Sequence, residues 1–581
     1  MDDGLVRAKP HLEQRHAAPG IGGFQMGFGV FFVCWIAAAA VALALGRDTS
    51  WDLRNYHHYN AYALMEGRWE IDLAPAGAHS FLHPGLDLPF YLLTQSPLNA
   101  WPQLVSVLQA GYAGLLAFLT IALANLACHG SAERVTIASA LAACFGLTGA
   151  ATLPEIGSTY NDIQIGCLVL GALIALLLAA GADELQEPSR AARLRFLAGS
   201  LGGCAVGLKL TAAIFPPALL LAAALAVCGG AASRAWAVAL LAMGGALGFA
   251  LTYGPWGWFL WVRFGNPFGP FFNNIFHSPL FPSTGQRDLR FLPDNLAEAL
   301  YYPFIWARRS EGVVLEPPLA DARFAIGLTA LLLVMLLGAW RWLYRNDRPQ
   351  RAWAGDQAAE RSERVAARAV RVVLAFTLAS YVAWLAAFSI LRYAVPIEVL
   401  LGVAVWAAAR ELLLASGPSA GWVLPAGWWR GGAALCVATA LTICMVVTEY
   451  PAHPREPFRW EREPQGSAVL AVKHHNLPED SLVLMLGPAV SFVAPSMDGI
   501  GVRFVGAPNP EWAGAADNPA SYTARVLQAV RSHTGPAFVL LEDADLYDRE
   551  AADLLQVEFD RASCRPVPNN LTRVVELCRW R

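Results

Sequence analysis

The hydrophobic residues of this chain gather in long runs that are separated by polar segments, and they do not alternate with a short period. The runs are about 20 residues long, which is the length that an α-helix needs to cross the hydrocarbon core of a bilayer. The pattern therefore predicts a polytopic α-helical membrane protein. The eleven predicted spans are residues 24–46, 102–127, 135–152, 162–181, 196–209, 211–229, 236–260, 324–344, 370–390, 394–414 and 431–449.

The composition agrees with a membrane protein. The chain has 581 residues, of which 56% are hydrophobic and only 15% are charged, whereas a soluble chain is about a quarter charged. The net charge of -3 gives no support for a nucleic-acid partner. The sequence has no P-loop, no dinucleotide-binding fingerprint and no HExxH motif, so nucleotide-driven chemistry and zinc proteolysis have no support either.

Basic residues in the short loops predict which side of the membrane each loop faces. The loops at 183–195 and 341–371 are rich in arginine, and with eleven spans both fall on the side of the N-terminus. That side is predicted to be the cytoplasm. The segments predicted on the outer side are 47–101, 153–161, 261–323 and 450–581.

Residues 450–581 follow a different pattern, with short runs typical of strands and one amphipathic helix. Strands are predicted at 481–486, 537–542 and 572–578, and a helix at 522–533. We therefore expect two domains. Residues 1–449 form the transmembrane domain, with long outer loops at 47–101 and 261–323, and residues 450–581 form a soluble extracytoplasmic α/β domain.

Two cysteines of the soluble domain, Cys564 and Cys578, flank a segment that could form a hairpin turning at Asn569-Asn570. A disulfide between them is consistent with an extracytoplasmic location. Two unpaired thiols are the alternative, and the sequence leaves both open.

The first outer loop begins with an unusual polar and aromatic stretch, "TSWDLRNYHHYNAYALMEGR" at 49–68. A helix here would place Asp52, Tyr56, Tyr59 and Ala63 along one face. A capping box, with Thr49 as the N-cap and Asp52 three residues later, would by itself explain the acid. It would not explain the run of polar and aromatic residues that follows, Asn55, Tyr56, His57, His58, Tyr59 and Asn60. A functional role for Asp52 is therefore the competing hypothesis.

Further polar residues lie in the outer segments. Downstream in the first loop, Asp72 is predicted to brace the loop, His83 is a candidate contact at the membrane interface, and the role of Asp87 stays open. The short loop "LPEIGSTYNDIQ" (153–164) places Glu155, Asn161 and Asp162 at the outer face. Asn161 and Asp162 could simply cap the next helix. A second acid on the side of Asp52 could also complete a polar or metal site.

Two cations interrupt apolar sequence at the outer face. Lys209 is one of only three lysines, with Lys9 and Lys473, and it lies within "AVGLKLTAAIF". A charge there is costly and usually faces a partner or a cavity, although a lysine can also extend its ammonium group to the interface. Arg392, next to Tyr393 in "LRYAVP", has only Glu398 as a nearby acid. A guanidinium at this depth suits a phosphate, which it can hold with two hydrogen bonds.

Four short motifs, "WDLRNYHHYNAYAL", "PEIGSTYND", "AVGLKLTA" and "LRYAVP", occur in this order on the predicted outer side. In order and topology they resemble the polyprenyl-phosphate-sugar glycosyltransferases of the C-type superfamily (GT-C), which include protein O-mannosyltransferases and the lipid A aminoarabinose transferase. The resemblance covers the first two-thirds of the chain. Asp52 is followed by Leu53, so the adjacent acidic pair that several members carry in this loop is missing.

The resemblance implies an inverting glycosyltransferase in the bacterial inner membrane, with a cytoplasmic N-terminus and a periplasmic C-terminal domain. It would move a sugar from a polyprenyl-phosphate donor to a hydroxyl of a glycan, lipid or protein. Asp52 would be the catalytic base, and Lys209, Arg392 and Tyr393 would bind the donor phosphate. No cofactor is expected to be obligatory, and a divalent metal is an alternative that would use Asp52, Asp162 and Glu155. The implied substrate contacts are Tyr56, His57, Tyr59, His83, Asn161 and Asp162.

Two other functions fit parts of the sequence. A secondary transporter could use Lys209 and Arg392 to bind an anion, although no inverted repeat is visible and the polar residues cluster on one face. A non-catalytic envelope assembly protein could use the outer domain for contacts. Convergence of the charged residues in one outward-facing site would favour the enzyme.

Overall fold

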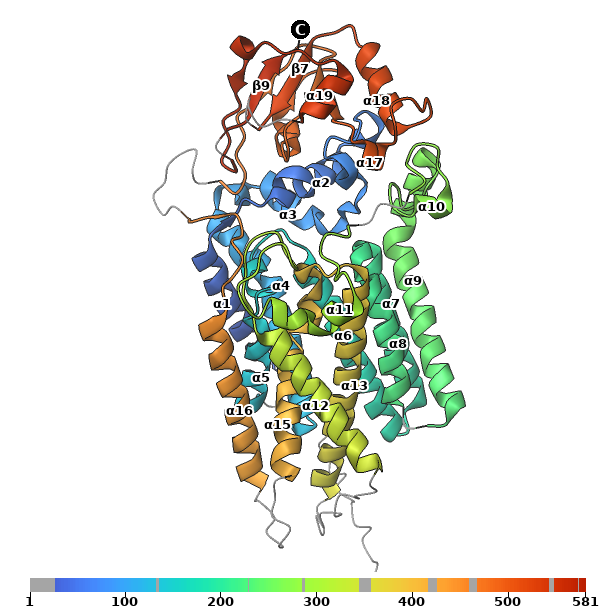
Figure 1. Ribbon diagram of the computed structural model, residues 1–581, viewed down its shortest axis with the longest axis vertical. Helices are drawn as coiled ribbons and strands as arrows, with labels where there is room; N and C mark the ends of the chain where they lie inside the picture. Colours follow the sequence, from blue (N-terminus) through green and yellow to red (C-terminus); the bar gives the residue numbers. More distant parts are fainter. Residues whose placement is uncertain are drawn as a thin grey trace, which may run out of the picture.

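The structure is a computed structural model that describes residues 27–131, 135–227, 229–284, 288–343, 357–415, 426–458, 468–542, 548–572 and 574–580. A bundle of long helices forms the lower part of the molecule, and a small sheet with its helices forms the upper part (Figure 1). Helices α2 (His58–Met65) and α3 (Leu88–Gln95) of the first outer loop lie between the two parts.

A helix lies at each of the eleven predicted spans, and most boundaries fall within a few residues of the prediction. The first three residues of the first span and part of the arginine-rich loop at 341–371 lie outside the described residues. The helices at these positions are α1 Phe28–Leu45, α4 Pro102–His129, α5 Ile137–Leu147, α6 Asp162–Glu184, α7 Pro188–Leu208, α8 Phe215–Ala226, α9 Ala231–Phe264, α12 Arg323–Leu343, α13 Gln357–Ala387, α15 Leu401–Ala415 and α16 Ala426–Val447.

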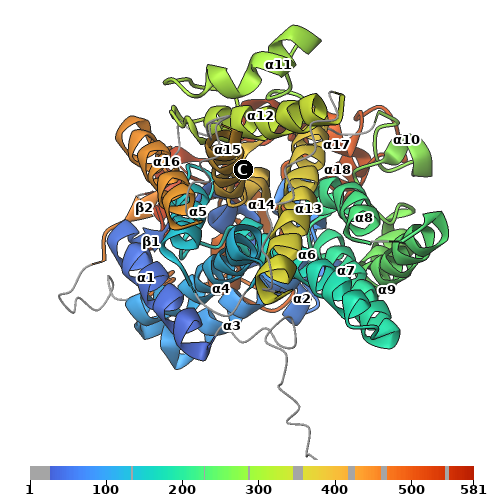
Figure 2. The ribbon, with the colours of Figure 1, turned by 90° about the horizontal axis from the view of Figure 1, so that it is seen from below.

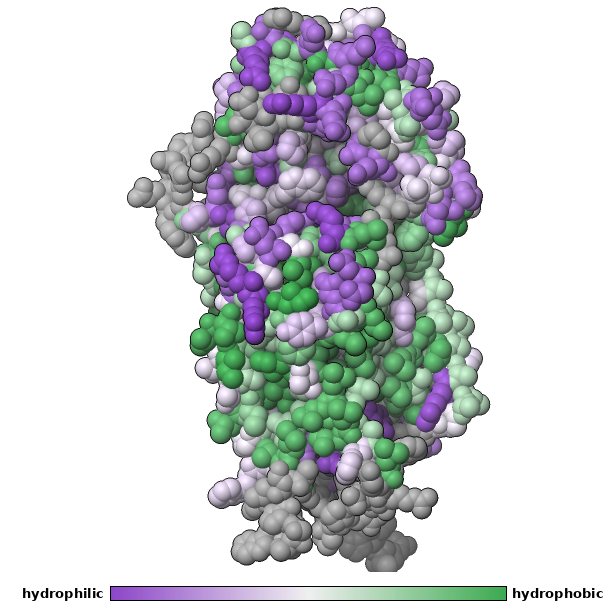
Figure 3. Space-filling view, viewed as in Figure 1, coloured by the Kyte–Doolittle hydropathy of each residue, from purple (hydrophilic) through white to green (hydrophobic). Residues whose placement is uncertain are grey.

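Within the described part of the chain, seven helices are long and apolar enough to cross a membrane: α1, α4, α6, α9, α12, α13 and α16. Others, such as α5 and α8, are shorter. On the face shown in Figure 3, apolar side chains form a broad belt over the bundle and polar ones gather above it. Viewed from below, α6 lies in the middle of the bundle (Figure 2). In keeping with this, 83% of its apolar window is buried, against 22% for α1 at the edge.

The spans predicted at 196–209 and 211–229 are separate helices with a break between them. Helix α7 ends at Leu208, Lys209 has an extended backbone with φ -148° and ψ 106°, and a 3₁₀ turn, Leu210–Ile214, leads into α8. Prolines in the first turn of α8 suit a helix start. The reversal leaves Lys209 at the end of α7 that lies near the outer loops.

Glycines bring α7 and α9 into close contact. A Cβ atom on Gly203 would lie 2.0 Å from the backbone oxygen of Gly245, and one on Gly199 would lie 2.0 Å from that of Leu241. Small residues let membrane helices approach closely, which increases their van der Waals contact. This contact attaches α9 to the bundle and fixes the position of α7.

We expect Gly203→Ala to lower the unfolding temperature in detergent, because the new methyl group would push α9 away from α7. Overpacking of this kind costs about 1–3 kcal/mol. Gly254→Ala in the same α9 is the matched control, since a Cβ there meets nothing within 4 Å. Equal unfolding temperatures for the two variants would contradict the close packing described above.

The upper part contains a five-stranded sheet in the order β6-β4-β7-β9-β8. Strands β6, β4 and β7 are parallel, and β9 and β8 extend the sheet antiparallel. The strands expected at 481–486, 537–542 and 572–578 are present as β4, β7 and the shorter β9, and the expected helix is α18. The bounds are β4 Leu482–Met485, β6 Arg503–Gly506, α17 Pro510–Ala513, α18 Tyr522–Arg531, β7 Ala537–Leu541, α19 Arg549–Leu555, β8 Arg565–Pro566 and β9 Glu576–Arg579.

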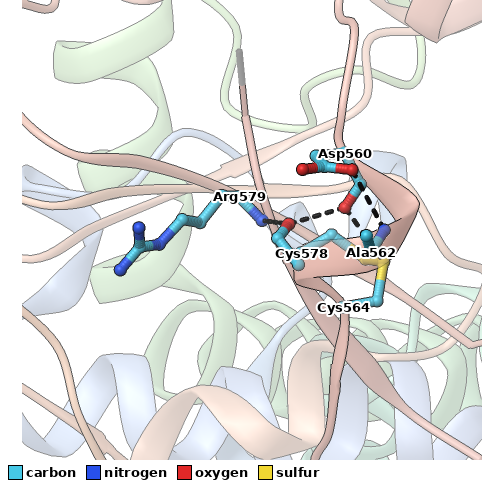
Figure 4. Close-up of a disulfide and its surroundings, with 6 residues drawn as sticks. Asp560, Ala562, Cys564, Cys578 and Arg579 are labelled. Carbon is cyan, nitrogen blue, oxygen red and sulfur yellow. Dashed lines mark hydrogen bonds between the residues drawn. A yellow bond between two sulfur atoms is a disulfide. The ribbon is translucent and has the colours of Figure 1, made fainter.

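Cys564 and Cys578 form a disulfide, which decides between the two alternatives left open by the sequence (Figure 4). Cys578 lies on β9, and Cys564 lies just before β8, which pairs with β9. The bond closes the hairpin at its open end. A disulfide agrees with an oxidising compartment for this domain.

The upper part is joined to the first outer loop by backbone hydrogen bonds. Strand β1 (Arg47–Asp48) pairs with β2 (Arg455–Glu456) directly after α1. Leu73 lies beside the edge strand β6, where its N–H donates to Phe504 and its carbonyl accepts from Gly506. The loop that contains Asp52 is therefore held between the sheet and the helix bundle.

Candidate functional site

The stretch "TSWDLRNYHHYNAYALMEGR" forms a helix, but a widened one. A π-helical turn, Leu53–His57, precedes α2. The capping box expected from Thr49 and Asp52 is not formed, because the side chain of Ser50 accepts from the N–H of Leu53 and Asp52 makes no capping hydrogen bond. The carboxylate of Asp52 is therefore not used to start the helix.

The carboxylate of Asp52 binds Arg392, which is 340 residues away in the sequence. Oδ2 of Asp52 lies 2.8 Å from Nη1 of Arg392 and accepts a hydrogen bond of 3.1 Å from the hydroxyl of Tyr56. The guanidinium of Arg392 lies over the ring of Tyr160, 4.5 Å from its centroid. Asp52 is buried, and Arg392 is only partly exposed, so the charges attract strongly.

This environment sets the protonation of Asp52. Burial by itself raises the pKa of the carboxyl group, but Arg392, His57 and His79 outweigh that effect and lower the pKa to about 2. Asp52 is therefore ionised at neutral pH and can accept a proton.

The lowered pKa predicts how acid affects the protein. The stability that Asp52 contributes is present above the unfolded-state pKa of about 3.9 and is lost as the pH falls through the folded-state pKa of about 2. We expect Arg392→Met to raise this pKa, because the main attractive charge is gone. In that variant the acid-induced loss of activity should begin at a higher pH than in the wild type, which a pH–rate profile would measure. If the wild type and Arg392→Met lost activity at the same acid pH, Arg392 would not be the group that lowers the pKa of Asp52.

The second cation, Lys209, binds a second acid. Its Nζ lies 2.6 Å from Oδ1 of Asp162 and 5.3 Å from the ring centroid of Tyr393. The sequence offers no acid next to Lys209 and only Glu398 near Arg392, and neither cation uses such a neighbour. Each cation pairs with an acid from a distant part of the chain, because folding brings the outer ends of α6, α7 and the segment after α13 together.

A third acid, Asp87, links the first loop to the segment before α6. Its Oδ1 lies 2.5 Å from Nδ1 of His57 and accepts a hydrogen bond of 2.9 Å from the side chain of Asn161. Burial by itself lowers the pKa of His57, but Asp87 and Asp52 outweigh it and raise the pKa. Asn161 is at the N-cap position of α6 but makes no capping hydrogen bond, so its side chain serves this link instead.

Aromatic rings surround the carboxylate of Asp52. The ring of Tyr56 is stacked on His79 with centroids 5.1 Å apart, and Trp51 meets the same histidine edge-on at 5.2 Å. Trp51 is 38% exposed. Flat, partly exposed rings next to a base suit the apolar faces of a sugar.

Glu155 lies in the same region and is the most deeply buried of its acids. It is 1% exposed, and among the described residues neither of its carboxylate oxygens has a hydrogen-bond partner. Burial and the charge of Asp162 raise its pKa well above the ordinary value, although Arg392 and Lys209 act in the opposite direction. Glu155 is therefore the acid of this site that favours the neutral form.

The structure does not bring two of the expected substrate contacts to Asp52. The hydroxyl of Tyr59 donates to Asp72 at 2.8 Å, and its ring belongs to the apolar core shared with the upper domain. The expected face of Asp52, Tyr56 and Tyr59 is broken by the π-turn, which rotates the following residues. His83 accepts from the N–H of Gly85, and its other nitrogen lies 3.1 Å from the carbonyl of Thr252 in α9.

Two neighbouring acids have structural roles. Asp72 accepts hydrogen bonds from Arg68, Tyr59 and the backbone of Phe504, which fits the expected brace. Glu398 does not pair with Arg392. Its carboxylate accepts from the backbone of Ala151 and Thr152, since it is fully buried beneath that loop.

Sequence reasoning missed Tyr160 and His79 as members of the site and did not assign Asp87. Tyr160 could have been found, because it lies inside the motif "PEIGSTYND" between Glu155 and Asn161. His79 lies in a loop with no periodic pattern, and only the fold places it against Tyr56.

The fit to a divalent metal can be judged from the same contacts. Two of the three candidate ligands, Asp52 and Asp162, are each bound to a cationic side chain. Across the described residues, no group of three or more His, Cys, Asp or Glu side chains is arranged to hold a metal ion. A metal would have to compete with both Lys209 and Arg392, so this donor set does not fit it well.

Comparison with known proteins identifies part of the chain. The model of glycosyltransferase family 87 matches residues 88–360, which include Glu155, Asp162 and Lys209 but not Asp52 or Arg392. No curated protein matches the chain.

Comparison with solved structures finds two weak likenesses. ArnT from Cupriavidus metallidurans bound to undecaprenyl phosphate has 14% sequence identity and a TM-score of 0.43, over 94% of this chain and 97% of that chain. The archaeal oligosaccharyltransferase AglB from Archaeoglobus fulgidus, in complex with an inhibitory peptide and a dolichol-phosphate, has 14% identity and a TM-score of 0.46. That match covers 88% of this chain and 69% of that chain.

The family match agrees with the resemblance that the four motifs had indicated. It favours the enzyme over the transporter and the assembly protein. The apolar helices place this enzyme in a membrane, with several of them long enough to cross it. The match over residues 88–360 thus supports a glycosyltransferase, and the apolar helices make it a multi-pass membrane enzyme.

Proposed function

We propose that this glycosyltransferase moves a sugar from a polyprenyl-phosphate donor to an acceptor hydroxyl at the outer face of the bacterial inner membrane, with inversion at the anomeric carbon. The observation that carries the proposal is the ion pair of an ionised acid, Asp52, with Arg392, beside a second cation, Lys209, whose ammonium lies over the ring of the next residue, Tyr393. All three lie where the helix bundle meets the outer loops. A base and a phosphate site side by side are what this reaction needs.

Arg392 suits a leaving phosphate because its guanidinium has several N–H donors. The hydrogen bond to Asp52 uses Nη1, so donors on the other nitrogens remain for a phosphate. Lys209 adds a second positive charge, and its ammonium group lies over the ring of Tyr393. Together the two cations can neutralise the charge that grows on the phosphate as it leaves.

The reaction is a single in-line displacement. The carboxylate of Asp52 takes the proton of the acceptor hydroxyl, and the oxygen forms a bond to the anomeric carbon. The bond from that carbon to the phosphate oxygen breaks, and its electron pair leaves with the lipid phosphate. General-base catalysis of this kind is worth about 10²–10⁴-fold in rate. Arg392 weakens the basicity of Asp52, so a phosphate that attracts Arg392 would make Asp52 a better base.

No metal or other cofactor takes part in this proposal. Chelation of divalent cations is therefore expected to leave transfer unchanged. If EDTA abolished activity and only added metal restored it, a metal ion and not Lys209 and Arg392 would neutralise the leaving phosphate.

Two observations support the orientation in this proposal. The disulfide between Cys564 and Cys578 agrees with a periplasmic C-terminal domain, and the arginine-rich loops favour a cytoplasmic N-terminus. The C-terminal domain lies directly above the first outer loop (Figure 1). It is therefore placed to cover the site and to contact a glycan, lipid or protein acceptor.

The test is to purify the protein with its membrane lipids and to identify the bound lipid by mass spectrometry. We expect a polyprenyl phosphate or its sugar derivative. Purified wild type in nanodiscs should also bind undecaprenyl phosphate as a probe, and it should release polyprenyl phosphate from a lipid-linked sugar when an acceptor is added. No binding and no release across a panel of polyprenyl-phosphate sugars would refute the proposal.

A further inference from the structure

The carboxyl ends of the parallel strands in the upper sheet contact the helix that contains Asp52. Ser491 follows β4, and Glu542 follows the neighbouring strand β7. In open α/β sheets, this edge is where ligands usually bind. Here the first outer loop of the transmembrane domain occupies it.

Two polar contacts join this edge to the π-turn. The hydroxyl of Ser491 donates to the carbonyl oxygen of Asn55, which lies in the middle of the turn. The guanidinium of Arg54 binds the carboxylate of Glu542, which also accepts from the hydroxyl of Thr572 at 3.3 Å. Both contacts fall within three residues of Asp52 in the sequence.

Apolar packing supports the same contact. Leu53 and Tyr59 share one buried core with Phe492 and Val493 of the segment Ser491–Ser496. All four side chains are almost completely buried. The segment after β4 thus fits against one side of the helix, and Asp52 faces Arg392 on another.

The π-turn gives these contacts a catalytic meaning. Hydrogen bonds from residue i to i+5 are rare, and π-turns occur frequently at functional sites. This pattern widens the helix so that both Tyr56 and His57 act on Asp52, the first by a hydrogen bond of 3.1 Å and the second by its charge. A regular α-helix would turn His57 away. A hydroxyl donor to a carbonyl inside the turn stabilises this wider form.

We propose that Ser491 and Glu542 are positioning residues for glycosyl transfer, which hold the turn Leu53–His57 and so aim the carboxylate of Asp52 at the acceptor hydroxyl. The C-terminal domain then has a role in the chemical step in addition to covering the site. This inference rests on the proposed role of Asp52 as the base. Neither residue touches the reacting atoms, so their effect is exerted through the backbone of the first loop.

The test compares Ser491→Ala with Ser481→Ala in the full-length protein in nanodiscs. Ser481 is a matched control, since it is equally buried, lies at the opposite end of β4 and donates to the carbonyl of Pro478 at 2.7 Å. We expect Ser491→Ala to speed amide hydrogen exchange at 53–57 and to lower kcat about tenfold to a hundredfold, as small misplacements of catalytic groups do. Binding of undecaprenyl phosphate should be unchanged. Glu542→Gln should act in the same direction, and Ser481→Ala should change neither exchange at 53–57 nor kcat.

The outcomes separate this inference from the proposed function. Wild-type exchange at 53–57 in Ser491→Ala, or faster exchange with wild-type kcat, would overturn the positioning role while transfer by the wild type still stands. If Ser491→Ala and Ser481→Ala lost kcat equally, the loss would come from a less stable C-terminal domain. That result would also overturn the positioning role of Ser491. If the wild type binds no polyprenyl phosphate and transfers no sugar, the proposed function fails, and the positioning role fails with it even though the contact is real.

Discussion

Replacing Asp52 with asparagine is expected to abolish glycosyl transfer, while the protein still folds with a stability lowered by the loss of the ion pair to Arg392. The amide has the shape of the carboxylate, and its oxygen can still accept from Arg392 and Tyr56. It cannot accept the proton of an acceptor hydroxyl. The loss should reach at least about 100-fold in kcat, since general-base catalysis contributes about 10²–10⁴-fold. Initial rates in proteoliposomes with a polyprenyl-phosphate sugar are the measurement.

Glu66→Gln is the matched control for this variant. Glu66 follows α2 on the same helical segment and is exposed, so the substitution removes the same charge outside the site. It should keep wild-type rates. Turnover retained in Asp52→Asn would show that another group is the base. A drop in stability with retained turnover would limit the role of Asp52 to its ion pair with Arg392.

The second large effect is expected at the two cations. Lys209→Met and Arg392→Met should each weaken binding of undecaprenyl phosphate about tenfold or more, because a hydrogen bond to a charged group contributes about 1.5–3 kcal/mol. Arg392→Lys should also be impaired, since an ammonium group cannot hold a phosphate with two parallel hydrogen bonds. Binding of labelled lipid to protein in nanodiscs measures the change.

The ion pair between Lys209 and Asp162 requires a further control. Asp162 is buried, so Lys209→Met alone leaves an unpaired acid and could weaken binding for that reason. In the double variant Asp162→Asn/Lys209→Met the uncompensated charge is gone. If Lys209 binds the phosphate, the double variant should remain weak. Wild-type affinity in the double variant would show that Lys209 only neutralises Asp162.

The membrane helices could be predicted because the property that decides them is local. A run of about 20 apolar residues is enough to cross a bilayer, and no distant contact changes that requirement. Helices such as α4 and α6 therefore lie where the hydrophobic pattern placed them. The same holds for the break at Lys209, where two prolines begin the next helix, and for the strand at 481–486. The strand β6 has no such pattern of its own and was missed.

The candidate site was found only in part. Asp52, Lys209 and Arg392 attracted attention because polar and charged residues are expensive in or beside apolar spans. That argument gives their importance but not their partners. It left Arg392 with Glu398 as the nearest acid, whereas Glu398 binds the backbone of Ala151 and Thr152.

Only the tertiary structure decided how these residues combine. Asp52 and Arg392 are 340 residues apart, and their contact depends on the packing of many helices between them. The π-turn after Asp52 accepts a hydrogen bond from Ser491 of the C-terminal domain, which is likewise distant in the sequence. Hydrophobic length is a property of each segment, so the sequence by itself determined where the membrane helices lie and that the polar motifs fall at their ends. Ion pairs and helix distortions are properties of contacts between segments, and they exist only after the chain has folded.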